Sequence, residues 1–151
     1  MKELYYELMV YAALVSGYPM PDVLPDVYFV EQEFFNETIC QGIKKCSIVG
    51  WYIDQSDAEK YKEVKHQDVY INNIGHQFST EFTNSVIVHE FVHFNQDLAG
   101  LMKRNPEYSD EFRLEYKAYY VQNKYLKKNR AAVQSCPNFA MCVSVRGGVF
   151  Q

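Results

Sequence analysis

The stretch that decides the fold reads SVIVHEFVH and covers residues 85–93. On a helix, His89 and His93 would lie one turn apart on the same face, so that both imidazoles reach one cation. Glu90 follows the first histidine directly, and the residues around all three are apolar. Burying two histidines and a glutamate is costly unless something satisfies them, and a metal ion would do so. The competing interpretation is a buried helix whose histidines are held by hydrogen bonds alone.

A third protein ligand is needed, because catalytic zinc sites combine three protein ligands with one open position. The helix predicted after residue 109 offers Glu111 and Glu115. Glu115 is the better candidate because it shares a helix face with Ala118, whose small side chain would let this helix approach the histidine-bearing one. Glu111 lies nearer the helix start, where an acidic residue commonly only complements the helix dipole.

These residue types indicate a particular chemistry. Zinc suits two imidazoles and a carboxylate, and it lowers the pKa of a bound water towards neutrality. Glu90 would not bind the metal but would take the proton of that water as it attacks a carbonyl carbon. The sequence therefore predicts one Zn²⁺ ion held by His89, His93 and Glu115, and a hydrolase of peptide or amide bonds with Glu90 as its general base. The partner would be a peptide or protein substrate.

The motif HEFVH at residues 89–93, followed by EYKA at residues 115–118, resembles the gluzincin metallopeptidases. In that family the first glutamate of the second motif is the third zinc ligand. The short chain is similar to the minimal gluzincins and to small metallopeptidase-like proteins of bacteria and their phages. The resemblance implies an α+β, zincin-like domain, in which a small twisted sheet packs on the histidine-bearing helix and the following glutamate-bearing helix. It also implies an edge strand that pairs with an extended substrate, expected at residues 67–74.

The chain departs from the family pattern at one position. Many gluzincins have Asp or Asn directly after the alanine of the second motif, where that residue orients a ligand histidine; this chain has Tyr119. Such partners tune metal affinity strongly, and the candidates for the role are Tyr119, Gln122 and Asn95. A donor for the developing oxyanion or for substrate is also expected, and the candidates are Tyr70, His76 and Tyr119, with His66 a further polar residue considered for it.

The 151 residues predict one domain. Hydrophobic periodicity, capping residues and turn signals predict its elements. We expect two shorter helices at 1–16 and 31–41. A longer helix is expected from a cap at Ser79 or Thr80 to about Leu98, where Gly100 ends it, and another from a cap at Ser109 or Asp110 to about Lys128. Strands are expected at 27–30, 47–54 and 67–74, a charged loop at 55–65, and an irregular tail at 131–151.

The composition of the chain limits the classes of partner that the protein could bind. The net charge of −4 and the lack of a basic face argue against nucleic acid, and we expect no membrane span and no signal peptide. A cytoplasmic location is weakly favoured, and the oligomeric state stays open. Cys40 and Cys46, like Cys136 and Cys142, form a closely spaced pair that could be a disulfide, a second metal site or free thiols. The expected location favours free thiols.

Two alternative functions remain. The first is a non-catalytic protein-binding or inhibitory module on a zincin scaffold. The presence of Glu90 argues against this function, because a purely structural site has no use for a base. The second is a protein without metal that binds a partner through a groove rich in tyrosine, of which the chain has 13. Metal content would separate the two.

Overall fold

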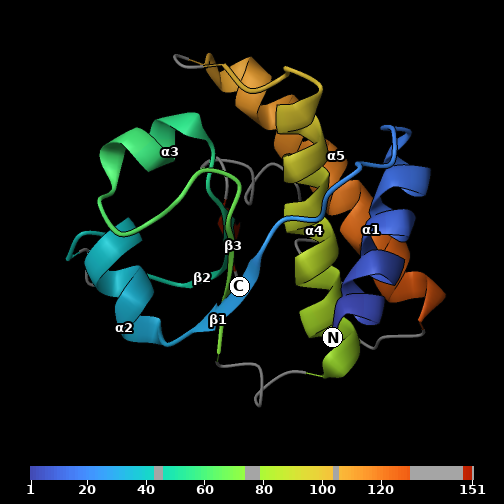
Figure 1. Cartoon of the computed structure of the whole chain (residues 1–151), viewed down its shortest axis with the longest axis horizontal. Coiled ribbons are helices and arrows are strands. Elements are labelled where there is room, and N and C mark those ends of the chain that lie inside the picture. Colours follow the sequence, from blue (N-terminus) through green and yellow to red (C-terminus); the bar gives the residue numbers. More distant parts are fainter. Residues whose placement is uncertain (43–45, 74–78, 104–105, 130–147, 151) are drawn as a thin grey trace.

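The computed structural model describes residues 1–42, 46–73, 79–103, 106–129 and 148–150. Its helices are α1 (Lys2–Ser16), α2 (Gln32–Phe34), the π-helix η1 (Phe35–Ile39), α3 (Gln55–Lys60), α4 (Thr80–Leu98) and α5 (Tyr108–Lys128), and its strands are β1 (Val27–Val30), β2 (Ile48–Tyr52), β3 (Val69–Asn72) and β4 (Gly148–Phe150). The three long helices stand on one side of the sheet, with the short helices on the other (Figure 1). This arrangement agrees with the predicted α+β class.

The four strands lie in the order β1-β3-β2-β4. Strands β1 and β3 are parallel, whereas β2 runs antiparallel to both of its neighbours. Every residue of β2 and β3 is buried, which identifies them as the central strands. The prediction that residues 67–74 form an edge strand is therefore wrong, because β3 is paired on both sides, with β1 and with β2. On its other side β2 pairs with the short strand β4.

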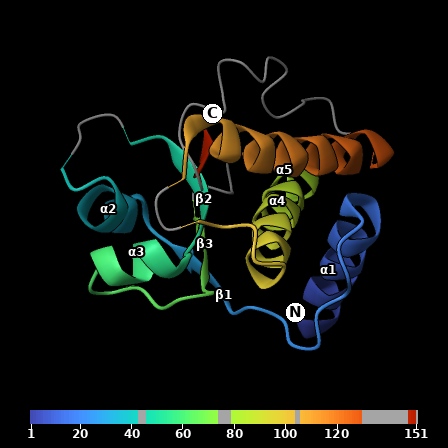
Figure 2. The ribbon, with the colours of Figure 1, turned by 90° about the horizontal axis from the view of Figure 1, so that it is seen from above.

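Two apolar clusters cover the two faces of the sheet. The larger one joins residues on one face of β2 and β3, such as Val49 and Ile71, to α4, α1 and α5. The smaller one joins residues on the other face, such as Trp51 and Tyr70, to the short helices. Seen from above, α4 lies between the sheet and α1, and α5 crosses over one end of this layer (Figure 2). Helix α4 is consequently the most enclosed helix, and the apolar residues of its motif lie in the larger cluster.

The segment 55–65, expected as a loop, begins with helix α3. Asp54 is its N-cap and accepts a hydrogen bond from the backbone amide of Asp57, whose side chain in turn accepts one from the amide of Asp54. This reciprocal capping satisfies two backbone donors that a short helix start leaves open. Asp57 also accepts a 3.1 Å hydrogen bond from the indole of Trp51, which fixes α3 against β2. The charged composition concealed this capping pair.

The last long helix begins earlier than predicted. Glu107, and not Ser109 or Asp110, is the N-cap of α5, and Asp110 occupies the third helical position of a second capping pair. The predicted irregular tail at 131–151 is corrected at its end, where β4 pairs antiparallel with β2. Residues 130–147 lie outside the described part of the chain.

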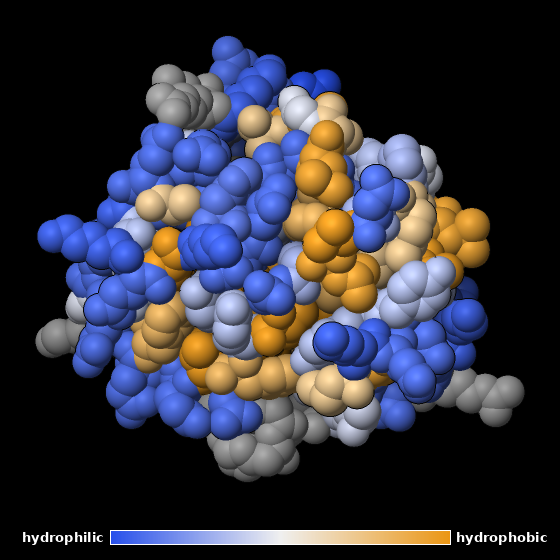
Figure 3. All heavy atoms as spheres, viewed as in Figure 1, coloured by the Kyte–Doolittle hydropathy of each residue, from blue (hydrophilic) through white to orange (hydrophobic). Residues whose placement is uncertain are grey.

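One disulfide joins Cys40 to Cys46, so the expectation of free thiols is wrong for this pair. Cys136 and Cys142 lie outside the described residues. None of the described helices has the length and apolar character that crossing a bilayer requires. The face shown in Figure 3 is mainly hydrophilic, with apolar side chains interspersed among the charged ones.

Candidate metal centre

Helix α4 carries the motif and is fixed at both ends by local interactions. The hydroxyl of Ser79 accepts a 3.2 Å hydrogen bond from the amide of Phe82, as an N-cap residue does. At the other end Gly100 has φ +74°, a conformation that glycine adopts without strain. Between these ends every residue from 85 to 96 is buried. Both predicted ends are confirmed, and the motif lies on a helix that is packed on all sides.

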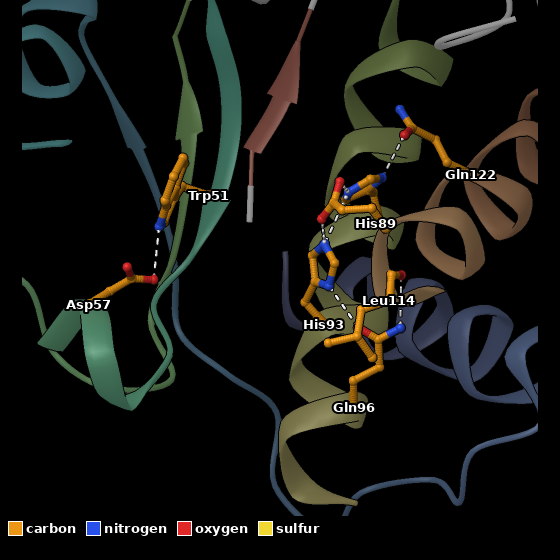
Figure 4. A network of polar contacts seen from close by, with 8 residues as sticks. Trp51, Asp57, His89, His93, Gln96, Leu114 and Gln122 are labelled. Atoms are coloured by element: carbon orange, nitrogen blue, oxygen red, sulfur yellow. Dashed lines mark hydrogen bonds and ion pairs between the residues drawn. The ribbon is translucent and has the colours of Figure 1, made fainter. Parts of the chain in front are cut away.

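Three side chains of α4 and α5 converge, as Figure 4 shows for the two histidines. Nε2 of His93 lies 2.5 Å from Oε1 of Glu115, and Nε2 of His89 lies 3.5 Å from Oε2 of the same carboxylate. The two Nε2 atoms are 3.2 Å apart. One donor atom from each residue falls within 4.8 Å of the other two, and all three side chains are fully buried. The predicted ligand set is therefore brought together in space.

The other ring nitrogens decide whether this group fits a cation. Nδ1 of His89 lies 2.9 Å from Oε1 of Gln122, and Nδ1 of His93 lies 2.7 Å from Oε1 of Gln96. An amide oxygen only accepts, so each Nδ1 carries the proton and each Nε2 presents its lone pair to the centre. Lone pairs of two imidazoles and a carboxylate thus meet where no water reaches them. A shared proton can satisfy one of these contacts, whereas a divalent cation satisfies all three.

Electrostatics in the group follow from burial and close contact. Burial alone would raise the pKa of Glu115, but the nearby imidazoles of His93 and His89 outweigh this effect and lower that pKa to about 2. Burial lowers the pKa of His89, which favours the neutral ring that a metal ligand needs. Positive charge at this position, whether an imidazolium or a cation carries it, keeps Glu115 ionised, which is the form in which a carboxylate binds a metal.

Glu90 stands beside this group without belonging to it. Its side chain is fully buried, and neither carboxylate oxygen makes a hydrogen bond of standard geometry within the described residues. Burial and the charge of Glu115 raise the pKa of Glu90 well above its usual value, against a smaller lowering effect of the Tyr52 amide. A buried carboxyl group with few partners and a perturbed pKa is typical of a functional position.

Comparison of the chain with protein-family models, with curated proteins and with solved structures gave no match. The chemistry of the site is therefore deduced from the positions of its own atoms. Those positions show a His89, His93 and Glu115 group placed to bind a metal ion, with one further buried carboxyl group beside it. Such a set can hold a cation and can move a proton next to it.

The other predicted site residues are scattered. The ring of Tyr119 packs edge-on against His89, with 4.5 Å between ring centroids, and so lies at the centre. Tyr70 lies on the opposite face of the sheet, where it donates a hydrogen bond to Asp68 and stacks on Phe34. His66 contacts Asp97 near the end of α4, 2.8 Å away. His76 lies outside the described residues.

Of the three candidates for orienting a ligand histidine, Gln122 makes the contact. Asn95 is buried but makes no hydrogen bond with its side chain within the described part of the chain. Gln96 was missed, although a sequence signal exists: it follows His93 by three positions and so shares its helix face. The enclosure of the site was also unforeseen, because the predicted cation was expected to be open to solvent.

Proposed function

We propose that this protein is a zinc-dependent hydrolase of peptide or amide bonds, of the gluzincin type and with a zincin-like fold. The observation that supports this most is the pairing of a convergent His89, His93 and Glu115 group with the buried carboxyl group of Glu90 beside it. A cation site that served only structure would not need this second acid. Zincin-like architecture is also consistent with an antiparallel strand, β2, that packs on the motif helix.

Each residue has a distinct role in the proposed reaction. His89, His93 and Glu115 would hold the ion through Nε2, Nε2 and the carboxylate. When bound, Zn²⁺ supplies the Lewis acidity that acidifies water and polarises a carbonyl group. Glu90 takes the proton of the attacking water and passes it to the leaving amine, a task that suits a carboxyl group whose pKa burial raises well above its usual value. Tyr119 packs against His89 and limits its rotation.

The burial of the site restricts how a substrate could reach it. The strand next to Glu90 is β2, and its outer side is paired with β4. An extended peptide that adds to β2 in the usual way of β-strand addition would therefore replace β4 at that side. The substrate contact predicted for Tyr70 is not supported by this geometry, because Tyr70 faces the other cluster. His76 lies outside the described residues, so the contact predicted for it stays a prediction.

Enclosure favours a second candidate function, a metal-binding module without catalysis. All three ligands and Glu90 are fully buried, as in a structural site. Structural zinc sites, however, are generally closed by four protein ligands. Among the described residues the ligand group contains three, and Glu90 is not one of its members. We therefore favour the hydrolase, and a measurement of peptide cleavage distinguishes the two functions.

The deciding experiment compares the wild type with Glu90→Gln. Both are purified, their metal content is measured by mass spectrometry, and both are incubated with a library of peptides. We expect one Zn²⁺ per chain in both, cleavage by the wild type alone, and a melting temperature that falls on chelation.

Zinc in both without any cleavage would support the non-catalytic module. Chains that bind no zinc and do not respond to chelators would leave the tyrosine-rich protein-binding alternative. A fully active Glu90→Gln variant would contradict the role of the base.

A further inference from the structure

Both ligand imidazoles are held by carboxamides whose orientation is itself fixed. Nε2 of Gln96 donates a 3.0 Å hydrogen bond to the carbonyl oxygen of Leu114, which can only accept. The amide oxygen of Gln96 therefore faces Nδ1 of His93. Leu114 directly precedes the third ligand, so this one side chain ties a ligand imidazole on α4 to the backbone that carries Glu115 on α5.

A longer chain of hydrogen bonds fixes the second carboxamide. The hydroxyl of Ser85 donates to the carbonyl oxygen of Phe82 at 2.6 Å, which leaves its oxygen free to accept from Nε2 of Gln122 at 3.2 Å. The amide oxygen of Gln122 then faces Nδ1 of His89 at 2.9 Å. A backbone carbonyl of α4 thus determines, through two side chains, which ring nitrogen of His89 carries the proton.

We infer that Gln96 and Gln122 are positioning residues that fix both imidazoles with Nε2 available to a cation and that set the affinity of the site for it. The inference rests on the proposed metal site. Both carboxamides are fully buried and both bridge α4 and α5. They hold the two helices in the register that brings the three ligands together.

The choice of an amide in place of a carboxylate has an electrostatic reason. A divalent cation in this site would face the ionised carboxylate of Glu115. Two further carboxylates in place of the glutamines would leave an excess of negative charge among groups that water does not reach, and such burial is costly. A carboxylate would, however, draw the Nδ1 proton more strongly and make the imidazole a better ligand. The amides thus favour a stable metal-free fold over maximal affinity.

Two substitutions at Gln122 separate positioning from mere packing. Gln122→Met keeps the volume but removes the acceptor, and we expect Zn²⁺ affinity to fall by about 10- to 100-fold. Gln122→Glu keeps the acceptor, and we expect wild-type or higher affinity with a lower melting temperature of the metal-free protein. A residue that only filled space would give both variants the same direction of change. Gln96→Met and Gln96→Glu should repeat the pattern.

The readouts are a competition titration with a chromophoric chelator and nitrogen-15 NMR of the His89 ring in the metal-free full chain. We expect a proton on Nδ1 in the wild type and in Gln122→Glu, and a mixture of tautomers in Gln122→Met. Asn95→Leu is the matched control, because it removes a buried carboxamide of α4 that makes no hydrogen bond to either imidazole, and it should leave tautomer and affinity unchanged.

A wild-type His89 protonated on Nε2, or a Gln122→Met variant with unaltered tautomer and affinity, would overturn the inference. A wild type with the expected tautomer that takes up no Zn²⁺ would instead refute the proposed function and leave the tautomer assignment in place. A wild type that binds Zn²⁺ but cleaves nothing would support positioning in the non-catalytic module. The three failures are therefore distinguishable.

Discussion

A Cβ atom on Gly50 would lie 3.1 Å from Oε1 of Glu90 and 2.7 Å from Cγ1 of Val86. The absence of a side chain at this one position of β2 allows the strand to approach α4 closely enough to cover the acid. Gly50 also pairs with Ile71 in β3 and with Val149 in β4, so that the close approach lies in the middle of the sheet. The backbone of β2 is consequently one wall of the candidate site.

Substitution of this glycine tests that wall. Gly50→Ala would lower the entropy of the unfolded chain, a gain of about 0.4–1 kcal/mol. The contact with Val86 is far shorter than any ordinary one, and overpacking of this kind costs about 1–3 kcal/mol. We therefore expect a net loss of stability, measured as a lower midpoint of urea unfolding.

A second variant for this prediction removes the Val86 side chain that the new Cβ atom would contact. Gly50→Ala combined with Val86→Ala should lose less stability than the sum of the two single substitutions, because the shortest contact is gone. Strict additivity would mean that β2 does not approach α4 as closely as the structure has it.

The third ligand is tested by a pair of isosteric substitutions on α5. Glu115→Gln removes the charge that faces both imidazoles, and we expect a loss of Zn²⁺ affinity larger than the roughly 10- to 100-fold typical of a lost partner of a ligand. Glu111→Gln, one turn earlier on the same helix, should keep wild-type affinity. Competition titration with a chelator measures both, and equal affinities for the two variants would remove Glu115 from the ligand set.

The site itself was largely predictable because its determinants are local. The separation of His89 and His93 places them on one helix face, and the ends of that helix are given by Ser79 and Gly100 in its immediate neighbourhood. Glu115 could be chosen over Glu111 from the face that it shares with Ala118, which is fully buried between the helices. Periodicity within one helix was sufficient for each of these predictions.

What could not be predicted depends on contacts between distant segments. Strand β3 has the alternation of an edge strand, yet β1 and β2 pair with its two sides. No local feature distinguishes a paired Cys40 from a free thiol. The enclosure of Glu90 arises from Gly50, forty positions away in another element, and a glycine within a strand indicates a close approach without naming the partner.

The disulfide between Cys40 and Cys46 closes a short loop with a sequence separation of 6. Cross-linking so few residues removes little freedom from the unfolded chain, and the loop-entropy relation gives about 2 kcal/mol. We expect a Cys40→Ala and Cys46→Ala double variant to lose about this much stability under oxidising conditions. Under reducing conditions the difference from the wild type should nearly vanish, as measured by urea unfolding with and without dithiothreitol. A difference that persists in the reductant would point to packing in place of the cross-link.

The raised pKa of Tyr52 predicts how the free energy of unfolding changes at alkaline pH. It is fully buried and donates a 2.6 Å hydrogen bond to Oδ2 of Asp97. Burial, together with the hydrogen bond and the charge of Asp97, raises the pKa of Tyr52 strongly above its ordinary value of 10.0. Because the folded pKa is raised, the stabilisation is present in full below pH 10 and is lost as the pH rises further, where only the unfolded chain releases the proton.

The corresponding variant is Tyr52→Phe. Each tyrosine of this kind contributes a slope of about −1.4 kcal/mol in the free energy of unfolding per pH unit above pH 10. The variant should lose about 1 kcal/mol near neutral pH, where a hydrogen bond is missing, and should then fall less steeply than the wild type between pH 10 and pH 11. Urea unfolding at a series of pH values measures both slopes. Parallel curves would show that the folded state ionises Tyr52 as readily as the unfolded chain does.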